Sequence, residues 1–585
     1  MNQDKNNLSN LRHSTSHLLA AAVMELWPNA KRAIGPATEN GFYFDFDFGN
    51  EKISEEDFPK IEAKMLEILP SWETFERQEL SAEEAKNQYI NNPYKNELIK
   101  EFTQNEEKVS FYKSGEFWDL CKGGHCEQPS KELKHFKLIS VAGAYWRGNE
   151  KNPMLTRIYG ISFKSKEELD THFTMLEEAK KRDHRKLGQE LNLFFIDERV
   201  GKGLIMWLPN GTIIKDEIEE LVKKKEKEAG YVRVSTPHIA KEELFTLSGH
   251  LPYYKDSMYP PMIMDDGAYY LRAMNCPHHH TIYLHNQKSY KELPLRLAEY
   301  GTCYRNELSG TLAGLLRVRG MTMNDAHIYC RKDQIKNEFK NVIKLTMEYF
   351  KIFGLEDYWF RLSKWNQKNT EKYIDEPENW EYTEQILREV LEELNVKFVE
   401  AENEAAFYGP KVDVQFKSIV GREETMSTIQ LDFAAKKRFG LSYIDQDGKE
   451  NNDVFVIHRA PLSVHERFIA FLIEHYAGKF PVWLSPLQIM LIPIADRHIE
   501  SANKIKVALA LEGIRVEVDN RSESMQSKIR DATLQKVPFL GIMGDRESNI
   551  DNLTASIRTR GGQDLGQLSI DLIIQKVKEE IDKKA

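Results

Sequence analysis

The chain has 585 residues, of which 41 % are hydrophobic and 29 % charged, and its formal net charge is −10. This composition is typical of a soluble globular protein, and the length predicts three or four domains. The acidic balance excludes a global basic field that would attract nucleic acid. No run approaches the roughly 18 apolar residues of a membrane-spanning helix, and the N-terminus has no secretory signal pattern. We therefore expect a multidomain protein without a membrane partner.

The cysteine content indicates the redox compartment. The sequence contains an odd and sparse set for so long a chain: Cys121, Cys126, Cys276, Cys303 and Cys330. Such a set argues against a disulfide framework and favours a reducing environment. The expected location is the cytoplasm.

The first 50 residues predict a helix and a strand. Ser9 or Asn10 is expected to cap an amphipathic helix that ends at Pro28. The segment 35–48, GPATENGFYFDFDF, alternates in the manner of a half-buried strand. We therefore expect an α+β domain at the start of the chain.

Two pairs of chemically active side chains occur in this region, each with a spacing of four. His13 and His17 share the face of the predicted helix opposite its apolar stripe. Cys121 and His125 follow in DLCKGGH. The four side chains can hold a metal or form a polar pocket that activates water, and their spacing does not choose between these. Solvation of the two helical histidines is the alternative.

A strand–loop–strand pattern lies in the middle of the chain. Segments 297–304 and 315–323 are predicted strands, and 306–314 is a turn-rich loop. Strand alternation is expected to place Arg305 and Glu307 on one face. An arginine there can bind a phosphate with both arms of its guanidinium, and the carboxylate can accept from an exocyclic amine. The alternative is an exposed hairpin with solvated charges.

The returning strand carries further polar groups. Arg317 and Arg319 precede Asp325 and His327, which are two residues apart and so share a face. Downstream, Arg467 begins an apolar helix within 453–478, where its burial requires an anionic partner. An enzyme that handles the phosphates of a nucleotide needs arginines, and here they come from several segments.

A cysteine and two histidines stand in three separate segments close to these charges. They are Cys276 in AMNCPHHH, His327 in NDAHIYC and His458 in VIHRAPL. One cysteine with two histidines is a catalytic zinc set, because it leaves the fourth position open. Taken singly, the residues are better explained as a core cysteine and solvated histidines.

The remaining segments suggest connections and a last domain. A charged helix over 164–188 has a basic end, explained either as a solvated linker or as a contact to an RNA backbone. Asn210 or Thr212 is expected to cap a long helix that ends at Gly230. After residue 483, strands alternate with helices, which predicts an α/β domain whose sheet is buried on both faces.

These motifs together resemble the threonyl-tRNA synthetases, which are class II aminoacyl-tRNA synthetases. The central matches are MNCP, AEYGTCYRNELSG, LLRVRGMT, DAHIYC, AAFYGPKVD, TIQLDF and VIHRAPL. HSTSHLLAAAV, DLCKGGH and FKLISVAGAYWRG resemble the editing domain of the family. The resemblance implies a multidomain α+β fold with four parts: an α+β editing domain (1–165), a linker helix (166–190), a class II catalytic core built on an antiparallel sheet (191–483) and an α/β anticodon-binding domain (484–585).

The resemblance also implies roles for residues of the catalytic domain. Zinc is bound by Cys276, His327 and His458. ATP, with Mg²⁺, is bound by Arg305, Glu307, Arg317, Met321 and Arg467, of which Arg305, Glu307 and Arg467 are the implied catalytic residues. Threonine is bound by Arg305, Asp325, Tyr408 and Gln430.

Further implied residues belong to the two outer domains. The editing pocket would hold His13, His17, Lys95, Asp119, Cys121 and His125. No metal is assigned there, although alanyl-tRNA synthetases bind zinc with a similar set. Contacts to the anticodon would come from Arg530, Glu547 and Arg558. The implied partners are tRNA(Thr), ATP, threonine and a second copy of the chain, joined through the catalytic domain.

The implied reaction is threonine activation by ATP, transfer to tRNA(Thr), and hydrolysis of mis-charged seryl-tRNA. The sequence departs from the family pattern at Met321, Met323, His278 and Ser463, and the first histidine pair starts at residue 13, so we expect no additional small N-terminal domain. One alternative is a prolyl or seryl synthetase. Another is an RNA-binding or regulatory paralogue with a decayed active site.

Overall fold

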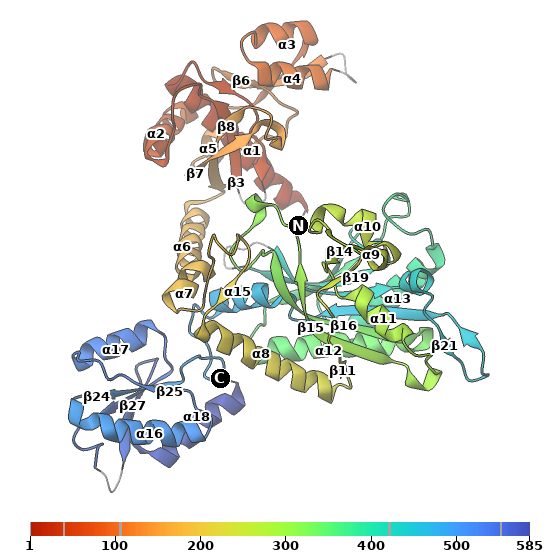
Figure 1. Ribbon diagram of the computed structural model, residues 1–585. Coiled ribbons are helices and arrows are strands. Elements are labelled where there is room, and N and C mark those ends of the chain that lie inside the picture. Colours follow the sequence, from red (N-terminus) through yellow and green to blue (C-terminus); the bar gives the residue numbers. More distant parts are fainter. Residues whose placement is uncertain (1, 39–40, 104–107, 419–422, 550–552, 585) are drawn as a thin grey trace. The chain divides into compact units, whose positions relative to one another are not determined.

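The computed structural model describes residues 2–38, 41–103, 108–418, 423–549 and 553–584 (Figure 1). It divides into two compact units, Met1–Glu177 and Glu178–Ala585. Among the helices of these described residues, none is long and apolar enough to cross a membrane.

The first unit packs helices against a five-stranded sheet in the order β1-β3-β8-β7, with β2 paired to β3. A second, three-stranded sheet has the order β4-β5-β6. The strands are β1 (Lys31–Arg32), β2 (Ala37–Thr38), β3 (Gly41–Asp47), β4 (Glu76–Ser81), β5 (Lys108–Ser114), β6 (Phe117–Leu120), β7 (His135–Tyr145) and β8 (Met154–Phe163). The helices are α1 (Asn2–Leu26), α2 (Phe58–Ile68), α3 (Ala82–Gln88), α4 (Pro93–Phe102) and α5 (Pro129–Glu132).

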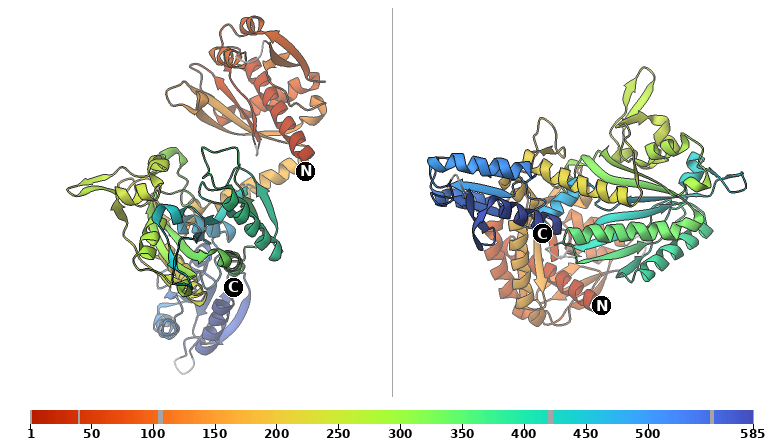
Figure 2. Two further views of the ribbon diagram at one scale, coloured as in Figure 1. Left: turned by 90° about the vertical axis from the view of Figure 1, so that its right-hand side faces the viewer. Right: turned by 90° about the horizontal axis from the view of Figure 1, so that it is seen from below.

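The core of this unit lies between α1, α2 and the large sheet. Figure 2 shows the ribbon of this unit in red and orange. Leu18 and Leu19 of α1 are fully buried against Phe44 and Phe46 of β3. Burial of each such side chain contributes about 1.5–3 kcal/mol. The prediction of a cap at Ser9 or Asn10 is wrong, since α1 begins at Asn2, and no glycine or proline in this first segment interrupts it.

The second unit is built on an eight-stranded sheet in the order β11-β15-β16-β23-β20-β19-β17-β18 (Figure 1). All neighbours are antiparallel except β11 with β15 and β17 with β18, at the two ends. The strands are β11 (Val232–Arg233), β15 (Leu295–Tyr304), β16 (Gly320–Arg331), β17 (Tyr358–Ser363), β18 (Phe398–Ala401), β19 (Lys411–Lys417), β20 (Glu423–Asp432) and β23 (Val454–Ala460).

Helices α8 (Pro209–Glu228), α12 (Ile335–Ile352), α13 (Pro377–Glu393) and α15 (His465–His475) share one apolar core with this sheet. A smaller sheet, β12-β14-β13, accompanies the short helices α9 to α11. Their bounds are β12 (Ile239–Lys241), β13 (Met262–Met264), β14 (Gly267–Leu271), α9 (Glu242–Leu247), α10 (His250–Tyr253), α11 (Cys276–Leu284) and α14 (Ala435–Phe439). Two ladders of two-residue strands complete the described part of this unit outside its C-terminal sheet. One pairs β9 (Phe194–Phe195) with β10 (Met206–Trp207), and the other pairs β21 (Tyr443–Ile444) with β22 (Glu450–Asn451).

A buried ion pair ties three elements of the central sheet together. Glu226 of α8 accepts hydrogen bonds from Arg459 of β23 at 2.8 Å and from Asn324 of β16 at 2.9 Å. All three side chains are almost fully buried. Removing one partner of such a pair typically costs 3–5 kcal/mol, because the other charge stays buried. The network fixes α8 against the strands that carry the site.

The predicted strand 315–323 is wrong in its bounds. The returning strand β16 runs over Gly320–Arg331, and residues 315–319 belong to the loop. Arg305 and Glu307 lie beyond the end of β15, so strand alternation does not position them. The loop backbone makes a hydrogen bond to α7 (His184–Glu190) instead of a strand ladder at this point: the amide of Leu315 donates to His184 Nε2 at 3.1 Å.

Two helices, α6 (Lys166–Arg182) and α7 (His184–Glu190), follow β8. The predicted single helix therefore breaks at Asp183, which caps α7. His184 is buried and interacts through Nδ1 with Glu474 of α15 at 2.8 Å. The predicted cap of α8 is also wrong, because Leu208 occupies that position and Asn210 donates to the carbonyl of Leu191.

The C-terminal part forms a five-stranded sheet in the order β25-β24-β26-β27-β28. β24 is parallel to β25 and β26, and the other pairs are antiparallel. Ile489 and Leu491 of β24 join the core of α16 and α18, whereas Ile492 joins that of α17, so helices cover both faces as expected. The elements are β24 (Ile489–Pro493), β25 (Val516–Val518), β26 (Phe539–Met543), β27 (Thr554–Thr559), β28 (Asp564–Ser569), α16 (Ile499–Leu511), α17 (Met525–Leu534) and α18 (Ile570–Lys583).

Candidate active site and editing pocket

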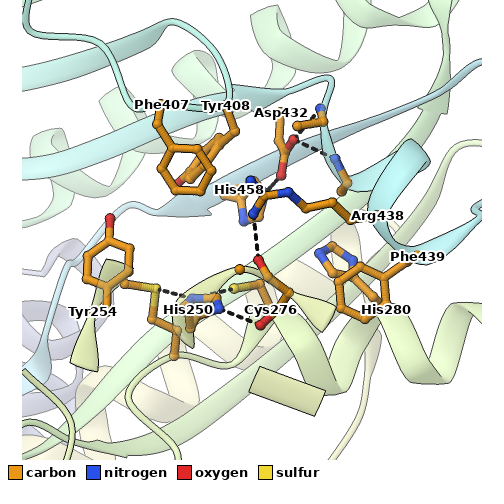
Figure 3. A pocket seen from close by; sticks show the side chains of 15 residues that line it. His250, Tyr254, Cys276, His280, Phe407, Tyr408, Asp432, Arg438, Phe439 and His458 are labelled. Atoms are coloured by element: carbon orange, nitrogen blue, oxygen red, sulfur yellow. Dashed lines mark hydrogen bonds and ion pairs between the residues drawn. The ribbon is translucent and has the colours of Figure 1, made fainter. Parts of the chain in front are cut away.

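The central sheet brings the predicted cysteine and two histidines together. His327 of β16 lies directly opposite His458 of β23 in the antiparallel ladder, and Cys276 is the first residue of α11. One ligand atom from each lies within 4.8 Å of the others. We call these three residues the catalytic cluster. Cys276 and His458 line one pocket with Tyr408 (Figure 3).

Both histidines of the catalytic cluster have one ring nitrogen engaged. His327 Nδ1 lies 2.8 Å from His279 Nδ1. His458 Nε2 lies 3.1 Å from the Asp432 carboxylate, and both residues are labelled in Figure 3. The other nitrogen of each ring remains for a ligand. Burial lowers the pKa of His327 well below its usual value, so the imidazole is neutral, as metal ligation requires.

The electrostatics of the catalytic cluster fit a cation. Burial raises the pKa of the Cys276 thiol well above its usual value, so a thiolate there needs a bound metal to stabilise it. Burial alone also raises the pKa of Asp432, but hydrogen bonds from His458 and the Ala435 amide keep it below its usual value. Asp432 is therefore ionised and can orient the His458 ring.

The residues expected to bind threonine lie around this cluster. Tyr408 donates a short hydrogen bond to Gln430, which is opposite His458 in the ladder of β20 and β23. Asp325 precedes His327 by two residues on β16 and accepts from Asn275 at 3.0 Å. The structure thus places Asp325 on the strand of His327 and Gln430 on the strand paired with that of His458, with Tyr408 hydrogen-bonded to Gln430.

The three predicted phosphate arginines are near enough to influence one another. Burial lowers the pKa of Arg467, and the charges of Arg305 and Arg317 lower it further. Its Nε donates to the carbonyl of Leu316. Arg317 forms an ion pair with Glu307 at 2.8 Å. This concentration of positive charge is suited to an anionic ligand.

Two departures from the family pattern have clear surroundings. Met321 is 4 % exposed and packs with Cys303, Val318 and Val464. Ser463 has φ +55°, in the left-handed region that costs a residue with a Cβ about 1–2 kcal/mol. A glycine, which the resemblance leads us to expect there, has no such cost.

The first unit brings together the other cysteine and histidine set. His13 and His17 lie on α1, and Cys121 and His125 in the loop after β6, with ligand atoms within 4.8 Å of one another. Cys121 Sγ lies 3.5 Å from His13 Nε2 and 3.3 Å from His125 Nε2. The His13 and His125 rings stack with centroids 4.5 Å apart. We call these four residues the N-terminal cluster.

Burial sets the protonation of the N-terminal cluster. It lowers the pKa of His125 to about 3 and that of His17 well below its usual value. It raises the pKa of the Cys121 thiol to about 11. The cluster therefore presents neutral imidazoles and a thiol at neutral pH. Solvation of His17 is excluded, because it is only 3 % exposed.

A buried charge pair adjoins this cluster. Lys95 Nζ lies 2.8 Å from Asp119, which also accepts from Arg32 at 3.1 Å and from Tyr89 at 2.6 Å. Burial lowers the pKa of Lys95, and the Asp119 carboxylate opposes that shift. Lys95 in turn interacts electrostatically with His13 and Cys121, so the predicted editing residues form one connected group.

The residues expected at the anticodon make separate contacts. Arg530 of α17 pairs with Asp531 at 3.4 Å, and Arg558 of β27 pairs with Asp564 at 3.7 Å. Glu547 accepts from the Ser556 hydroxyl and the Gly544 amide. The two arginines are half exposed or more, which leaves them accessible to RNA.

Sequence reasoning missed four residues that contact the catalytic cluster or its neighbours: His279, Asp432, Glu299 and Asn275. His279 follows Cys276 by three residues, which places both on one face of α11. Asp432 ends the motif TIQLDF. The sequence positions of His279 and Asp432 could therefore have pointed to them. No sequence pattern pointed to Glu299, because its contact with His279 depends on how β15 lies against α11.

Three family models match the chain. The model of the tRNA synthetase class II core domain (G, H, P, S and T) covers residues 261–476, and that of the anticodon binding domain covers 488–580. The threonyl and alanyl tRNA synthetase second additional domain matches 109–159. With the antiparallel sheet and its arginines, these matches define a class II aminoacyl-tRNA synthetase.

Curated relatives narrow the class. The threonine–tRNA ligase of Anoxybacillus flavithermus is 49 % identical over 98 % of this chain and 89 % of its own length. Threonine–tRNA ligase 1 of Bacillus subtilis is 47 % identical over the same shares. A solved structure described as the RNA binding domain of threonyl-tRNA synthetase from Cryptosporidium parvum is 31 % identical, covers 68 % of this chain and 98 % of its own, and has a TM-score of 0.64. The chain belongs to the threonine–tRNA ligase family.

Proposed function

We propose that this chain activates threonine with ATP, transfers the threonyl group to the 3′ end of tRNA(Thr), and hydrolyses mis-charged seryl-tRNA(Thr). The observation that carries the proposal is the convergence of Cys276, His327 and His458 from three segments, beside Tyr408 and an ionised Asp432. The family match and the connected N-terminal cluster support the two halves of the reaction.

The donor set of the catalytic cluster fits one zinc ion per chain. Such a set suits the chemical problem, because threonine differs from valine by a hydroxyl in place of a methyl, and an apolar pocket separates such isosteres by only about 10²-fold. When bound, zinc supplies open coordination positions for the amino and hydroxyl groups of threonine, which valine cannot satisfy. Serine also has the hydroxyl, so a second, hydrolytic site is required.

We assign the remaining roles in activation to charged and polar side chains. Arg305, Arg317 and Arg467 stabilise the charge that develops on the phosphates of Mg²⁺-bound ATP. Glu307 accepts from the adenine amine once it leaves Arg317, with Met321 packed near the base. Asp325 and Tyr408 orient the substrate amino group, and Gln430 lines the threonine pocket through its bond with Tyr408.

The N-terminal cluster is assigned to editing. Its neutral histidines can accept a proton from an attacking water, and Cys121 shapes the pocket. Lys95, held by Asp119, places a cation where charge develops during hydrolysis of the seryl ester. We assign no metal to this pocket.

Partners and location complete the proposal. Val232 is 52 % exposed on β11, the edge of the central sheet, which supports homodimerisation through α8 and β11, since an uncovered apolar edge favours association. Arg530, Glu547 and Arg558 would contact the anticodon of tRNA(Thr). The five cysteines are free thiols, which agrees with a cytoplasmic location. We also propose that the chain consists of four parts, with boundaries at residues 165, 190 and 483.

Amino-acid-dependent ATP–pyrophosphate exchange tests the proposal. Zinc-loaded protein is expected to exchange with threonine, more weakly with serine, and not with valine or proline. The same preparation is assayed for its metal content. Exchange that threonine does not support, or that proline supports better, would overturn the assignment.

A further inference from the structure

A buried chain of hydrogen bonds runs from the catalytic cluster into the protein. His327 Nδ1 lies 2.8 Å from His279 Nδ1, and His279 Nε2 lies 3.1 Å from Glu299 Oε2. His327 and His279 are at most 1 % exposed, and Glu299 is 4 % exposed. The chain of bonds is therefore shielded from solvent.

The far end of the chain is anchored by Glu299. Its carboxylate accepts from the Thr236 amide at 3.0 Å and hydroxyl at 2.8 Å, and Arg272 lies 3.4 Å away. Burial alone would raise the pKa of Glu299, but the hydrogen bonds from His279 and Thr236 lower it to about 2. The group is ionised at neutral pH, so it can only accept hydrogen bonds.

The ionised carboxylate fixes the direction of every bond in the chain. A neutral His279 donates from Nε2 to Glu299, so its Nδ1 carries no proton and accepts. His327 therefore donates from Nδ1, and the lone pair of its Nε2 is free. The second histidine of the catalytic cluster is set differently, because His458 Nε2 contacts Asp432 directly and leaves Nδ1 free.

We propose that His279 and Glu299 are positioning residues that hold His327 in the tautomer and ring orientation needed to ligate the metal through Nε2. The inference rests on the proposed zinc site, which it deepens by assigning a different ligating nitrogen to each histidine. Outer partners of this kind typically account for 10–100-fold in metal affinity.

Zinc affinity and the absorption spectrum of the cobalt-substituted full chain test the inference. Zinc dissociation constants are measured by chelator competition for the unchanged protein, His279→Ala, His279→Gln and Glu299→Gln. His279→Ala is expected to weaken zinc binding by about 10–100-fold and to alter the cobalt bands. Glu299→Gln removes the charge that fixes the tautomer and is expected to weaken binding by about tenfold.

His278→Ala is the matched control. His278 precedes His279 on α11 and is also buried, but neither of its ring nitrogens has a hydrogen-bond partner among the residues that the structure describes. It is expected to keep the zinc affinity within about twofold, since it lies outside the chain of bonds. Circular dichroism establishes folding, and His279→Gln replaces His279→Ala if the latter does not fold.

The outcomes separate the inference from the proposed function. If the unchanged protein binds no zinc, the proposed site and the inference both fail. If it binds zinc and the folded His279 variants keep its affinity and cobalt spectrum, the inference alone is overturned. An equal loss in His278→Ala would also overturn it, because the effect would then belong to the helix rather than to the hydrogen bonds.

Discussion

The catalytic and N-terminal clusters have nearly the same residue types but different surroundings. Each histidine of the catalytic cluster is connected to a carboxylate, His458 directly to Asp432 and His327 through His279 to Glu299. In the N-terminal cluster, His13 Nδ1 contacts the Gly124 carbonyl and His125 Nδ1 contacts the Ser14 hydroxyl. His17 Nδ1 has no hydrogen-bond partner among the described residues.

The charge near each cluster also differs. Asp325 and Asp432 both raise the pKa of Cys276 further after burial has done so, so the catalytic cluster lies in a field that favours a cation. Lys95 opposes positive charge at His13 and His17. The comparison teaches that a cysteine and histidine set is not a metal site by composition alone. Its outer partners decide whether it suits a metal ion or neutral acid–base groups.

The largest effect is expected from Cys276→Ala. The variant should lose zinc and reduce threonine-dependent exchange by about 10³-fold or more, the several kcal/mol that a bound metal contributes. Deacylation of seryl-tRNA(Thr) should be unchanged, because the N-terminal cluster is intact. Exchange within a few-fold of the unchanged protein would contradict the role of the catalytic cluster in activation, and a loss of deacylation would contradict the separation of the two clusters.

The reciprocal variant alters the N-terminal cluster. His13→Ala combined with His17→Ala should reduce deacylation of seryl-tRNA(Thr) by about 10²-fold, the lower range for loss of general acid–base groups. Threonylation should continue, and seryl-tRNA should accumulate when serine is supplied. Normal deacylation in this variant would refute the editing assignment.

Zinc should stabilise the unchanged protein. A free concentration 100 times the dissociation constant is expected to add about 2.7 kcal/mol to the free energy of unfolding of the part that binds it. Calorimetry before and after chelation measures the shift, and Cys276→Ala is the control that should show none. A shift of the same size in His13→Ala combined with Cys276→Ala would mean that the ion binds elsewhere.

The N-terminal cluster should make the free energy of unfolding depend on pH. His125 has a pKa of about 3 in the folded state, below its usual 6.5, so between these values the unfolded chain binds a proton that the folded chain does not. Stability is therefore complete above pH 6.5 and falls as the pH decreases, by about 1.4 kcal/mol per pH unit for one such group. The melting temperature of His125→Asn should vary less between pH 7 and pH 5.5.

The smallest effect is expected at Ser463. Replacement by glycine should raise the free energy of unfolding by up to about 1 kcal/mol, since it relieves the left-handed backbone. Zinc content and deacylation should not change, which distinguishes backbone strain from the chemistry of either cluster. A loss of exchange activity in Ser463→Gly would show that the serine side chain itself has a role.

Several features of the fold and site were predictable from sequence because they depend on local spacing. The class II core, the editing domain and the anticodon-binding domain are confirmed by the family matches, as is threonine–tRNA ligation by the relatives. The alternatives of a prolyl or seryl synthetase and of a decayed paralogue lose their support. The residue roles within each site remain predictions.

Other features depend on packing between distant segments and could not be predicted from the sequence. Strand alternation did not predict the positions of Arg305 and Glu307, because β15 ends before them and both residues lie in the loop that follows. The chain from His327 to Glu299 joins β16, α11 and β15. No periodicity within a single segment encodes a contact of that kind. The break at Asp183, by contrast, has a local signal, because its side chain caps α7 and aspartate is a preferred N-cap residue.

The contacts of His184 have a consequence for where the chain can be cut. Its ring accepts from the Leu315 amide and interacts with Glu474. Helix α7 therefore provides a hydrogen-bond partner both to the loop after β15 and to the helix that carries Arg467. A truncated chain that starts at Leu191 would leave the buried Leu315 amide without its partner, at a cost of about 1–3 kcal/mol. It would also remove the partner of Glu474, whose side chain is 31 % exposed. A catalytic fragment is therefore expected to be more stable if it begins before Asp183, within what the sequence presents as a linker helix.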